Sequence, residues 1–281
     1  MTPRSFRWIL LSTGALAIGA CAPKDKTPPP PPPSPNVVAV SAKDFAFEAP
    51  SQIPAGMTTF KLTNAGPSFH HLIVARIDSG KTFADASAAF AKPGPPPPWL
   101  VIVGGPNAPD PGAQSNATFN IAAGEYVLFC MVDIPGGVPH VAKGMIHQLT
   151  VTPSNGPAAA APTADVAVTL ADYSFTLSQP LTSGKHTLSV TTSPGQLHEI
   201  EMVKLAPGKT ADDFMKWMGG KMDTPPPGHA MGGIGPAVPG STLYFTADFT
   251  PGDYVLVCFM PDMKDGKPHF MHGMLKSITV S

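Results

Sequence analysis

The sequence predicts an all-β fold of two tandem Greek-key β-sandwich domains, each with one short helix. Three observations predict it: an internal repeat, short strand-like runs, and prolines and glycines gathered into turns and linkers. The chain has 281 residues, which is enough for about two domains. Its 36 prolines and 27 glycines cluster between apolar runs, and this pattern indicates folded domains joined by linkers.

The two halves of the sequence align when one is shifted by 128 positions. Asp44-Phe45-Ala46-Phe47 then aligns with Asp172-Tyr173-Ser174-Phe175, and the apolar run 124–130 aligns with 252–258. Two copies are too few for a stacked solenoid, so each copy is predicted to be a domain by itself. We place the first domain at residues 37–152 and the second domain at residues 164–281. The linker between them, residues 153–163, is rich in alanine and proline.

Each half contains six short runs rich in β-branched and aromatic residues, which predict strands. In the first half these are residues 37–41, 58–63, 71–77, 118–121, 126–131 and 146–151. In the second half they are residues 166–170, 186–191, 199–205, 243–249, 254–259 and 276–280. One helix is predicted in each half, because Thr82 with Asp85 and Thr210 with Asp213 have the spacing of a capping box.

Residues 1–21 have the layout of a bacterial export signal. Arg4 and Arg7 precede a short apolar run, and Ile18-Gly19-Ala20-Cys21 resembles the lipobox at which lipoproteins are cleaved. We expect an exported lipoprotein of the cell envelope, facing the periplasm or the cell exterior, that meets the membrane only through a lipid on Cys21. A plain signal peptide that leaves Cys21 free is the alternative. The proline-rich residues 22–36 predict a stiff tether.

Charge and cysteine usage exclude other classes of protein. The net charge of −1 argues against nucleic-acid binding, which needs a basic surface. The three cysteines are Cys21, Cys130 and Cys258, so neither domain has the pair that a disulfide requires. An isolated thiol in each domain of an exported protein indicates sulfur that is buried or bound to a metal.

Each half carries the same sulfur and imidazole groups in the same order. They are His70, Cys130, His140 and Met145 in the first half, and His198, Cys258, His269 and Met274 in the second. The first His lies 60 residues before the Cys in both halves, and the second His lies five residues before the Met. Only the Cys-to-His step differs, at ten residues in one half and eleven in the other. One thiolate, two neutral imidazoles and a weak thioether suit copper in electron transfer.

This ordered set resembles the copper-binding pattern of the cupredoxin (blue copper) family. The resemblance covers both halves and includes the Gly that precedes each Met and the strand that follows it. It implies that the two His and the Cys of each half are equatorial copper ligands and that Met145 and Met274 are axial ligands. The Cys-to-His loops are longer than in small blue proteins and look more like the type 1 site of copper nitrite reductases.

Other donors beside these residues leave alternatives open. His71 and Glu199 occupy equivalent positions next to the first His. Strand alternation turns them to the opposite face, so we expect them at the surface. The alternative is that His71, and not His70, is the ligand. His147 and His272 flank the methionines and are candidates to compete for the metal or to hydrogen-bond to a ligand.

Four functions follow from these patterns. The first is electron transfer with a redox partner in the envelope, and the second is copper storage or delivery with a copper-handling partner. The third is a metal-free scaffold. A copper oxidase or nitrite reductase ranks last, because the residues before each Cys are Phe129 and Val257, where that family has a His.

Overall fold

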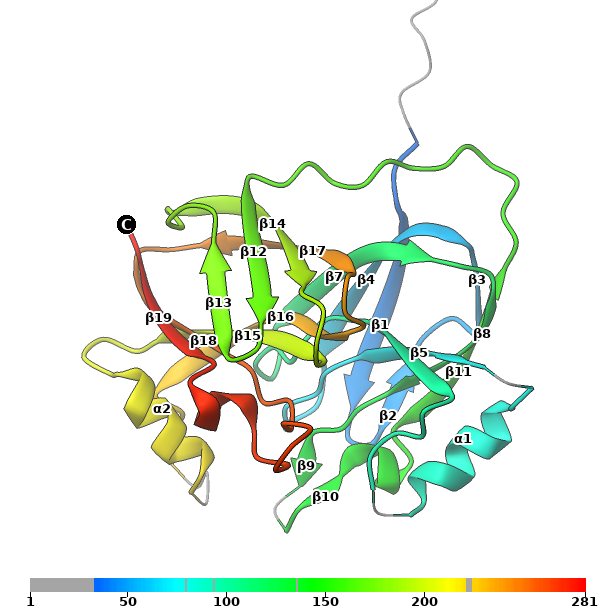
Figure 1. Cartoon of the computed structure of the whole chain (residues 1–281), viewed down its shortest axis with the longest axis horizontal. Helices are drawn as coiled ribbons and strands as arrows, with labels where there is room; N and C mark the ends of the chain where they lie inside the picture. Colours follow the sequence, from blue (N-terminus) through cyan, green and yellow to red (C-terminus); the bar gives the residue numbers. More distant parts are fainter. Residues whose placement is uncertain (1–32, 79, 93, 135, 221–223) are drawn as a thin grey trace, which may run out of the picture. The chain divides into compact units, whose positions relative to one another are not determined.

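The computed structural model describes residues 33–281, apart from residues 79, 93, 135 and 221–223. β strands make up most of its regular structure, and each half has one short α helix within the described residues, α1 (Phe83–Phe90) or α2 (Ala211–Met218) (Figure 1). The predicted all-β class is therefore confirmed. Among the described residues, none of the helices has both the length and the apolar character needed to span a membrane.

The first half is a sandwich of two sheets. One sheet contains β1 (Asn36–Lys43), β2 (Ala46–Glu48), β4 (Gly56–Asn64) and β7 (Gln114–Ile121). The other contains β3 (Gln52–Pro54), β5 (Ile73–Ile77), β6 (Leu100–Gly104), β8 (Gly124–Phe129) and β11 (Ile146–Thr152). β4 lies beside β7, and β8 lies between β5 and β11, so the chain crosses repeatedly between the sheets. Such crossovers are typical of a Greek-key sandwich.

The second half repeats this arrangement. Its first sheet contains β12 (Val166–Ala171), β13 (Ser174–Leu177), β14 (Gly184–Thr192) and β17 (Thr242–Phe249). Its second sheet contains β15 (His198–Leu205), β16 (Gly228–Ala237), β18 (Gly252–Val257) and β19 (Leu275–Val280). The first half also has a small hairpin of β9 (Asp133–Ile134) and β10 (Val138–Pro139), which the bridge between Pro261 and Pro268 replaces in the second half.

The two halves share one sheet. β17 of the second half lies antiparallel to β7 of the first, and this contact joins eight strands in the order β13-β12-β14-β17-β7-β4-β1-β2. The Asn116 side chain closes the junction, because its amide nitrogen donates to the carbonyl oxygen of Thr246 at 2.7 Å and its oxygen accepts from the Thr246 amide at 3.1 Å. The bounds predicted for the two domains stay a prediction, since the described halves pack together as one unit.

Each helix covers the outer face of the second sheet of its half. In the first half Ala86 and Phe90 of α1 pack against Val127 and Phe129 of β8. In the second half Phe214 of α2 packs with Val203, Val255 and Val257. Both predicted capping boxes are confirmed, since the hydroxyl oxygens of Thr82 and Thr210 each accept a hydrogen bond from the backbone amide three residues later.

The N-terminal predictions fall mostly on residues that are not described. The export signal, Cys21 and the tether up to residue 32 lie outside the described residues.

Two candidate metal centres

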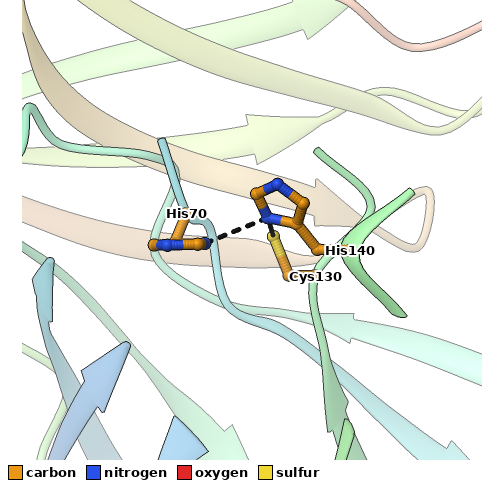
Figure 2. Close-up of side chains that lie close together, drawn as sticks. All are labelled: His70, Cys130 and His140. Atoms are coloured by element: carbon orange, nitrogen blue, oxygen red, sulfur yellow. Dashed lines mark hydrogen bonds between the residues drawn. The ribbon is translucent and has the colours of Figure 1, made fainter. Parts of the chain in front are cut away.

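The first candidate centre lies at one end of the first sandwich. His70 precedes β5, Cys130 follows β8, and His140 begins the 3-10 helix η1 (His140–Lys143). The Nδ1 atom of His140 lies 3.6 Å from the sulfur of Cys130 and 3.0 Å from the Nδ1 atom of His70. Figure 2 shows the three side chains converging, although they come from separate parts of the chain. All three residues are at most 1% exposed.

The second candidate centre repeats this geometry. The Nδ1 atom of His269 lies 3.5 Å from the sulfur of Cys258 and 3.1 Å from the Nδ1 atom of His198. His269 begins the 3-10 helix η2 (His269–His272), and the two rings make an angle of 50°, against 52° in the first centre. In each centre the three donor atoms lie within 4.8 Å of one another.

Strand alternation explains why each cysteine points into its sandwich. Tyr126, Leu128 and Cys130 face the core between the sheets, whereas Val127 and Phe129 face the helix. The same alternation turns His70 inward and His71 to the other face. The structure therefore selects His70, and not His71, as the histidine beside Cys130.

A left-handed glycine returns the chain from each second histidine to the cysteine. Gly144 and Gly273 have φ values of 101° and 100°, a conformation that glycine adopts readily and other residues avoid. The turn brings the carbonyl oxygens of Met145 and Met274 to the backbone amides of Cys130 and Cys258, at 3.4 and 3.2 Å. Both methionine side chains are fully buried. Their role as axial ligands stays a prediction.

An aspartate fixes the orientation of the first histidine in each half. The Nε2 atom of His70 lies 2.6 Å from a carboxylate oxygen of Asp44, and that of His198 lies 3.0 Å from one of Asp172. A carboxylate accepts and does not donate, so Nε2 carries the proton and the lone pair of Nδ1 faces the centre. The sequence analysis did not assign these aspartates, although their alignment in the repeat was a signal that pointed to them.

Burial sets the protonation of the donors in the metal-free protein. It lowers the pKa of all four histidines, His70, His140, His198 and His269, so the imidazoles are neutral at pH 7. Burial also raises the pKa of the Cys130 thiol to about 12 and raises the pKa of Cys258 as well. Each centre therefore holds a thiol and two neutral rings, and a bound cation would displace the thiol proton.

The donor set and its spacing fit a soft metal ion. Bonds of about 2.0 Å to nitrogen and 2.3 Å to sulfur, the lengths known for zinc, place three trigonal donors about 3.5–3.8 Å apart. The sulfur-to-nitrogen distances of 3.5 and 3.6 Å already match, whereas the Nδ1 atoms, at 3.0 and 3.1 Å, would need to separate by about 0.5 Å. Thiolate with imidazole, and a thioether close by, is the set that suits copper.

The second histidines of the two centres have different neighbours. In the first centre, the edge of the Phe45 ring packs against His140, with 5.1 Å between centroids. In the second centre, the Nε2 atom of His269 lies 3.4 Å from Oε1 of Gln196 and 3.9 Å from a carboxylate oxygen of Asp262. The sequence analysis assigned no role to Gln196 or Asp262.

The expectation that His71 and Glu199 lie at the surface is wrong. Both are buried, and they accept hydrogen bonds from the backbone amides of Met131 and Phe259, each the residue after a cysteine. Asn107 of the first half donates to Glu199 at 3.2 Å. Packing between the halves covers a face that alternation alone leaves open.

The histidines that flank the methionines lie outside the clusters. Nε2 of His272 lies 3.1 Å from Asp265, and these two residues form a third group of possible metal donors with Asp262. His147 lies on β11, and its buried Nε2 atom makes no hydrogen bond within the described part of the chain.

Comparisons with known proteins give structural similarities only. No protein-family model matches the chain, and no curated protein matches it. Among solved structures, it is similar to dithionite-reduced auracyanin from Roseiflexus castenholzii, with 22% identity over 43% of this chain and 100% of that chain and a TM-score of 0.31. Auracyanin A, a "blue" copper protein from Chloroflexus aurantiacus, has 22% identity over 42% of this chain and 100% of its own, with a TM-score of 0.29. Blue copper oxidase from Nitrosomonas europaea has 16% identity over 88% of this chain and 85% of its own, with a TM-score of 0.26. TM-scores at this level do not identify a function.

Proposed function

We propose that this protein is an envelope-anchored electron-transfer protein with up to two type 1-like copper sites. The observation that carries the proposal is the pair of buried clusters, in each of which one sulfur and two imidazole nitrogens converge. We call the cluster of His70, Cys130 and His140 site one, and the cluster of His198, Cys258 and His269 site two. Bound copper would supply a one-electron couple.

The residues around each site suit that role because they hold the donors in place without the metal. The distance from each cysteine sulfur to Nδ1 of the second histidine already matches that of a trigonal centre, and Asp44 and Asp172 orient one ring each. Donors that barely move when the charge of the metal changes favour rapid electron exchange. The burial of all six donor residues excludes water, so the chain supplies a dry pocket and no place for a substrate at the metal.

The location and the partner rest on the N-terminal sequence pattern. We propose that a lipid on Cys21 anchors the protein and that residues 22–36 let it reach a redox or copper-handling protein in the envelope. In the native host, Cys21→Ala is expected to move the protein from the membrane fraction to the soluble fraction. A protein that stays soluble with Cys21 intact would contradict the anchor.

The visible spectrum of the copper-loaded protein tests the copper proposal. The part of the chain after Cys21 is purified, Cu(II) is added stepwise, and the spectrum is recorded. We expect an intense thiolate-to-copper band that saturates at two equivalents. Cys130→Ser and Cys258→Ser are each expected to remove the part of the band intensity that comes from one site. The double variant is expected to remove the whole band. Met57→Leu, a change on β4, serves as the control and is expected to leave the band unchanged.

The same titration separates the alternatives. Tight binding of Cu(I) without a thiolate band with Cu(II) would favour copper storage or delivery. No copper binding would leave a metal-free scaffold. More than two coppers per chain together with turnover of nitrite would favour an enzyme.

A further inference from the structure

The two sites differ in the groups that face their second histidine, and this difference carries an inference that rests on the proposed function. At site two, Nδ1 of His269 faces Cys258 and His198, whereas Nε2 faces the opposite direction. Nε2 lies 3.4 Å from Oε1 of Gln196 and 3.9 Å from Oδ2 of Asp262. A ring that bound a metal through Nδ1 would carry its proton on Nε2 and direct it at these two acceptors.

Asp262 is a buried anion held by hydrogen-bond donors. It is 3% exposed, and its Oδ2 atom accepts from the Tyr173 hydroxyl and, at 2.9 Å, from Nε2 of Gln196. Its other oxygen accepts from the backbone amide of Lys264 at 2.8 Å. Hydrogen bonds from Tyr173, Gln196 and the backbone keep the pKa of Asp262 well below its usual range, so the carboxylate stays charged at neutral pH.

Tyr173 joins this arrangement from the two-residue turn between β12 and β13. Its φ value is 63°, a left-handed conformation that residues other than glycine adopt at a cost in free energy. In this conformation its hydroxyl reaches Asp262, and the edge of its ring packs against His269 with 5.7 Å between centroids.

Site one lacks this network in the described part of the chain. The repeat places Phe45 opposite Tyr173 and Ser68 opposite Gln196, and the Ser68 hydroxyl donates to Asp44 and not to His140. Pro139 pairs with Asp133 in the first half, and Pro268 pairs with Pro261 in the second. Asp133 therefore corresponds to Pro261, and the next residue, Ile134, corresponds to Asp262. Phe45 packs its ring on His140 and offers no acceptor.

We propose that Asp262, together with Gln196, lowers the reduction potential of site two below that of site one. A negative charge close to the metal stabilises Cu(II), which has one more positive charge than Cu(I). An acceptor for the ring proton makes the imidazole a stronger ligand, and this also stabilises Cu(II) relative to Cu(I). The two sites then have separate roles: in a half-reduced protein the electron resides at site one, while site two stays oxidised.

The test uses proteins that each retain one site. Cys130→Ser leaves site two, Cys258→Ser leaves site one, and the thiolate-to-copper band confirms loading before the midpoint potential is titrated. We expect the lower potential in Cys130→Ser. Asp262→Asn is then added to both proteins. At a fixed solution potential, we expect it to raise the ratio of Cu(I) to Cu(II) at site two about tenfold, a shift of about 59 mV, and to leave site one unchanged.

Three further variants keep the result interpretable. Gln196→Leu is expected to shift site two in the same direction by a smaller amount, and it serves if Asp262→Asn does not fold. Glu125→Gln, which removes an exposed charge on β8 of the first half, is the control and is expected to leave the potential of site one unchanged. Asp262→Glu, which keeps the charge, is expected to keep most of the low potential.

The outcomes of this test are separable. Absence of the thiolate band from both single-site proteins refutes the proposed function itself. A normal band with equal potentials at the two sites, or with no shift on Asp262→Asn, overturns the inference and leaves the proposed function standing.

Discussion

The two halves of this protein have nearly the same donor geometry in different surroundings. Their sulfur-to-nitrogen distances are 3.6 and 3.5 Å, and their nitrogen-to-nitrogen distances are 3.0 and 3.1 Å. Beyond the donors, an aromatic ring covers His140, whereas a buried amide and a carboxylate face His269. The two halves share the three clustered donors and the aspartate beside the first histidine, whereas the groups that face the second histidine differ.

The largest expected effect is a pH dependence that the two sites share. Because the pKa of each thiol is raised and the pKa of each histidine is lowered, copper binding releases one proton from sulfur and none from the rings above about pH 6.5. Affinity should therefore rise about tenfold per pH unit, or about a hundredfold between pH 6.5 and 8.5. Competition with a chelator of known pH dependence measures this in each single-site protein. An affinity independent of pH would mean that the thiols are already ionised.

The next effect tests whether the shared aspartates act alike. Asp44→Ala and Asp172→Ala remove the acceptor for the ring proton of His70 and His198. Each is expected to weaken copper binding about 10- to 100-fold at its own site and to leave the other site unchanged. The same competition assay measures it, with Asp253→Ala on the surface of β18 as the control. Loss at both sites from one change would point to general unfolding instead.

A smaller effect concerns the glycine turns. Gly144→Ala and Gly273→Ala place a side chain where φ is about 100°, with no atom within 4 Å of the new Cβ. The expected loss in free energy of unfolding is about 1–2 kcal/mol for each, from backbone strain alone. Urea unfolding of the copper-free protein measures it. Gly156→Ala, whose φ is not positive, is the control and should be close to neutral. Unequal losses at Gly144 and Gly273 would break the equivalence of the two turns.

The smallest expected effect concerns Glu201, a buried carboxyl group of the second half. Glu201 occupies the position that Ile73 has in the repeat, and it is buried against Asn107-Ala108 of the first half, near Glu199 and Asp110. Burial raises its pKa well above the usual 4.5, so the folded protein holds the proton more tightly than the unfolded chain. Its contribution to stability is therefore present below about pH 4.5 and is lost as the pH rises through the raised pKa.

The comparison of Glu201→Gln with the unchanged protein isolates this contribution. Relative to the variant, the unchanged protein should lose unfolding free energy as the pH rises above about 4.5. Urea unfolding across this range measures the slope, and Glu125→Gln at the exposed start of β8 is the control. Parallel pH profiles for the protein and Glu201→Gln would contradict the raised pKa.

The sequence predicted those features that depend on short-range pattern. Every predicted strand run coincides with an observed strand, because alternation and β-branched residues are local signals. The helices begin where Thr82 and Thr210 cap them. The donors of each centre were found because the repeat displayed them twice at almost fixed spacing.

Features that depend on contact between distant segments were not predictable from those patterns. Glu199 is buried beside Asn107 of the other half, and no spacing rule reports such a contact between distant segments. Asp262 corresponds to Ile134 in the first half, so the repeat did not display this carboxylate twice. Strands β2, β3, β9, β10 and β13 escaped prediction because none is longer than four residues, and β16 because it is rich in Gly. Strand β6 was also missed, since it follows a run of prolines at residues 95–98.

The junction between β7 and β17 has a consequence for the history of the molecule. A single ancestral sandwich would have needed its own protection along that strand, whereas here the two edge strands pair with each other at Tyr244 and Thr118. Once both edges had adapted to this cover, separating the copies would expose a row of free amide and carbonyl groups ready to join a neighbouring molecule. Either copy expressed alone is therefore expected to self-associate along this edge.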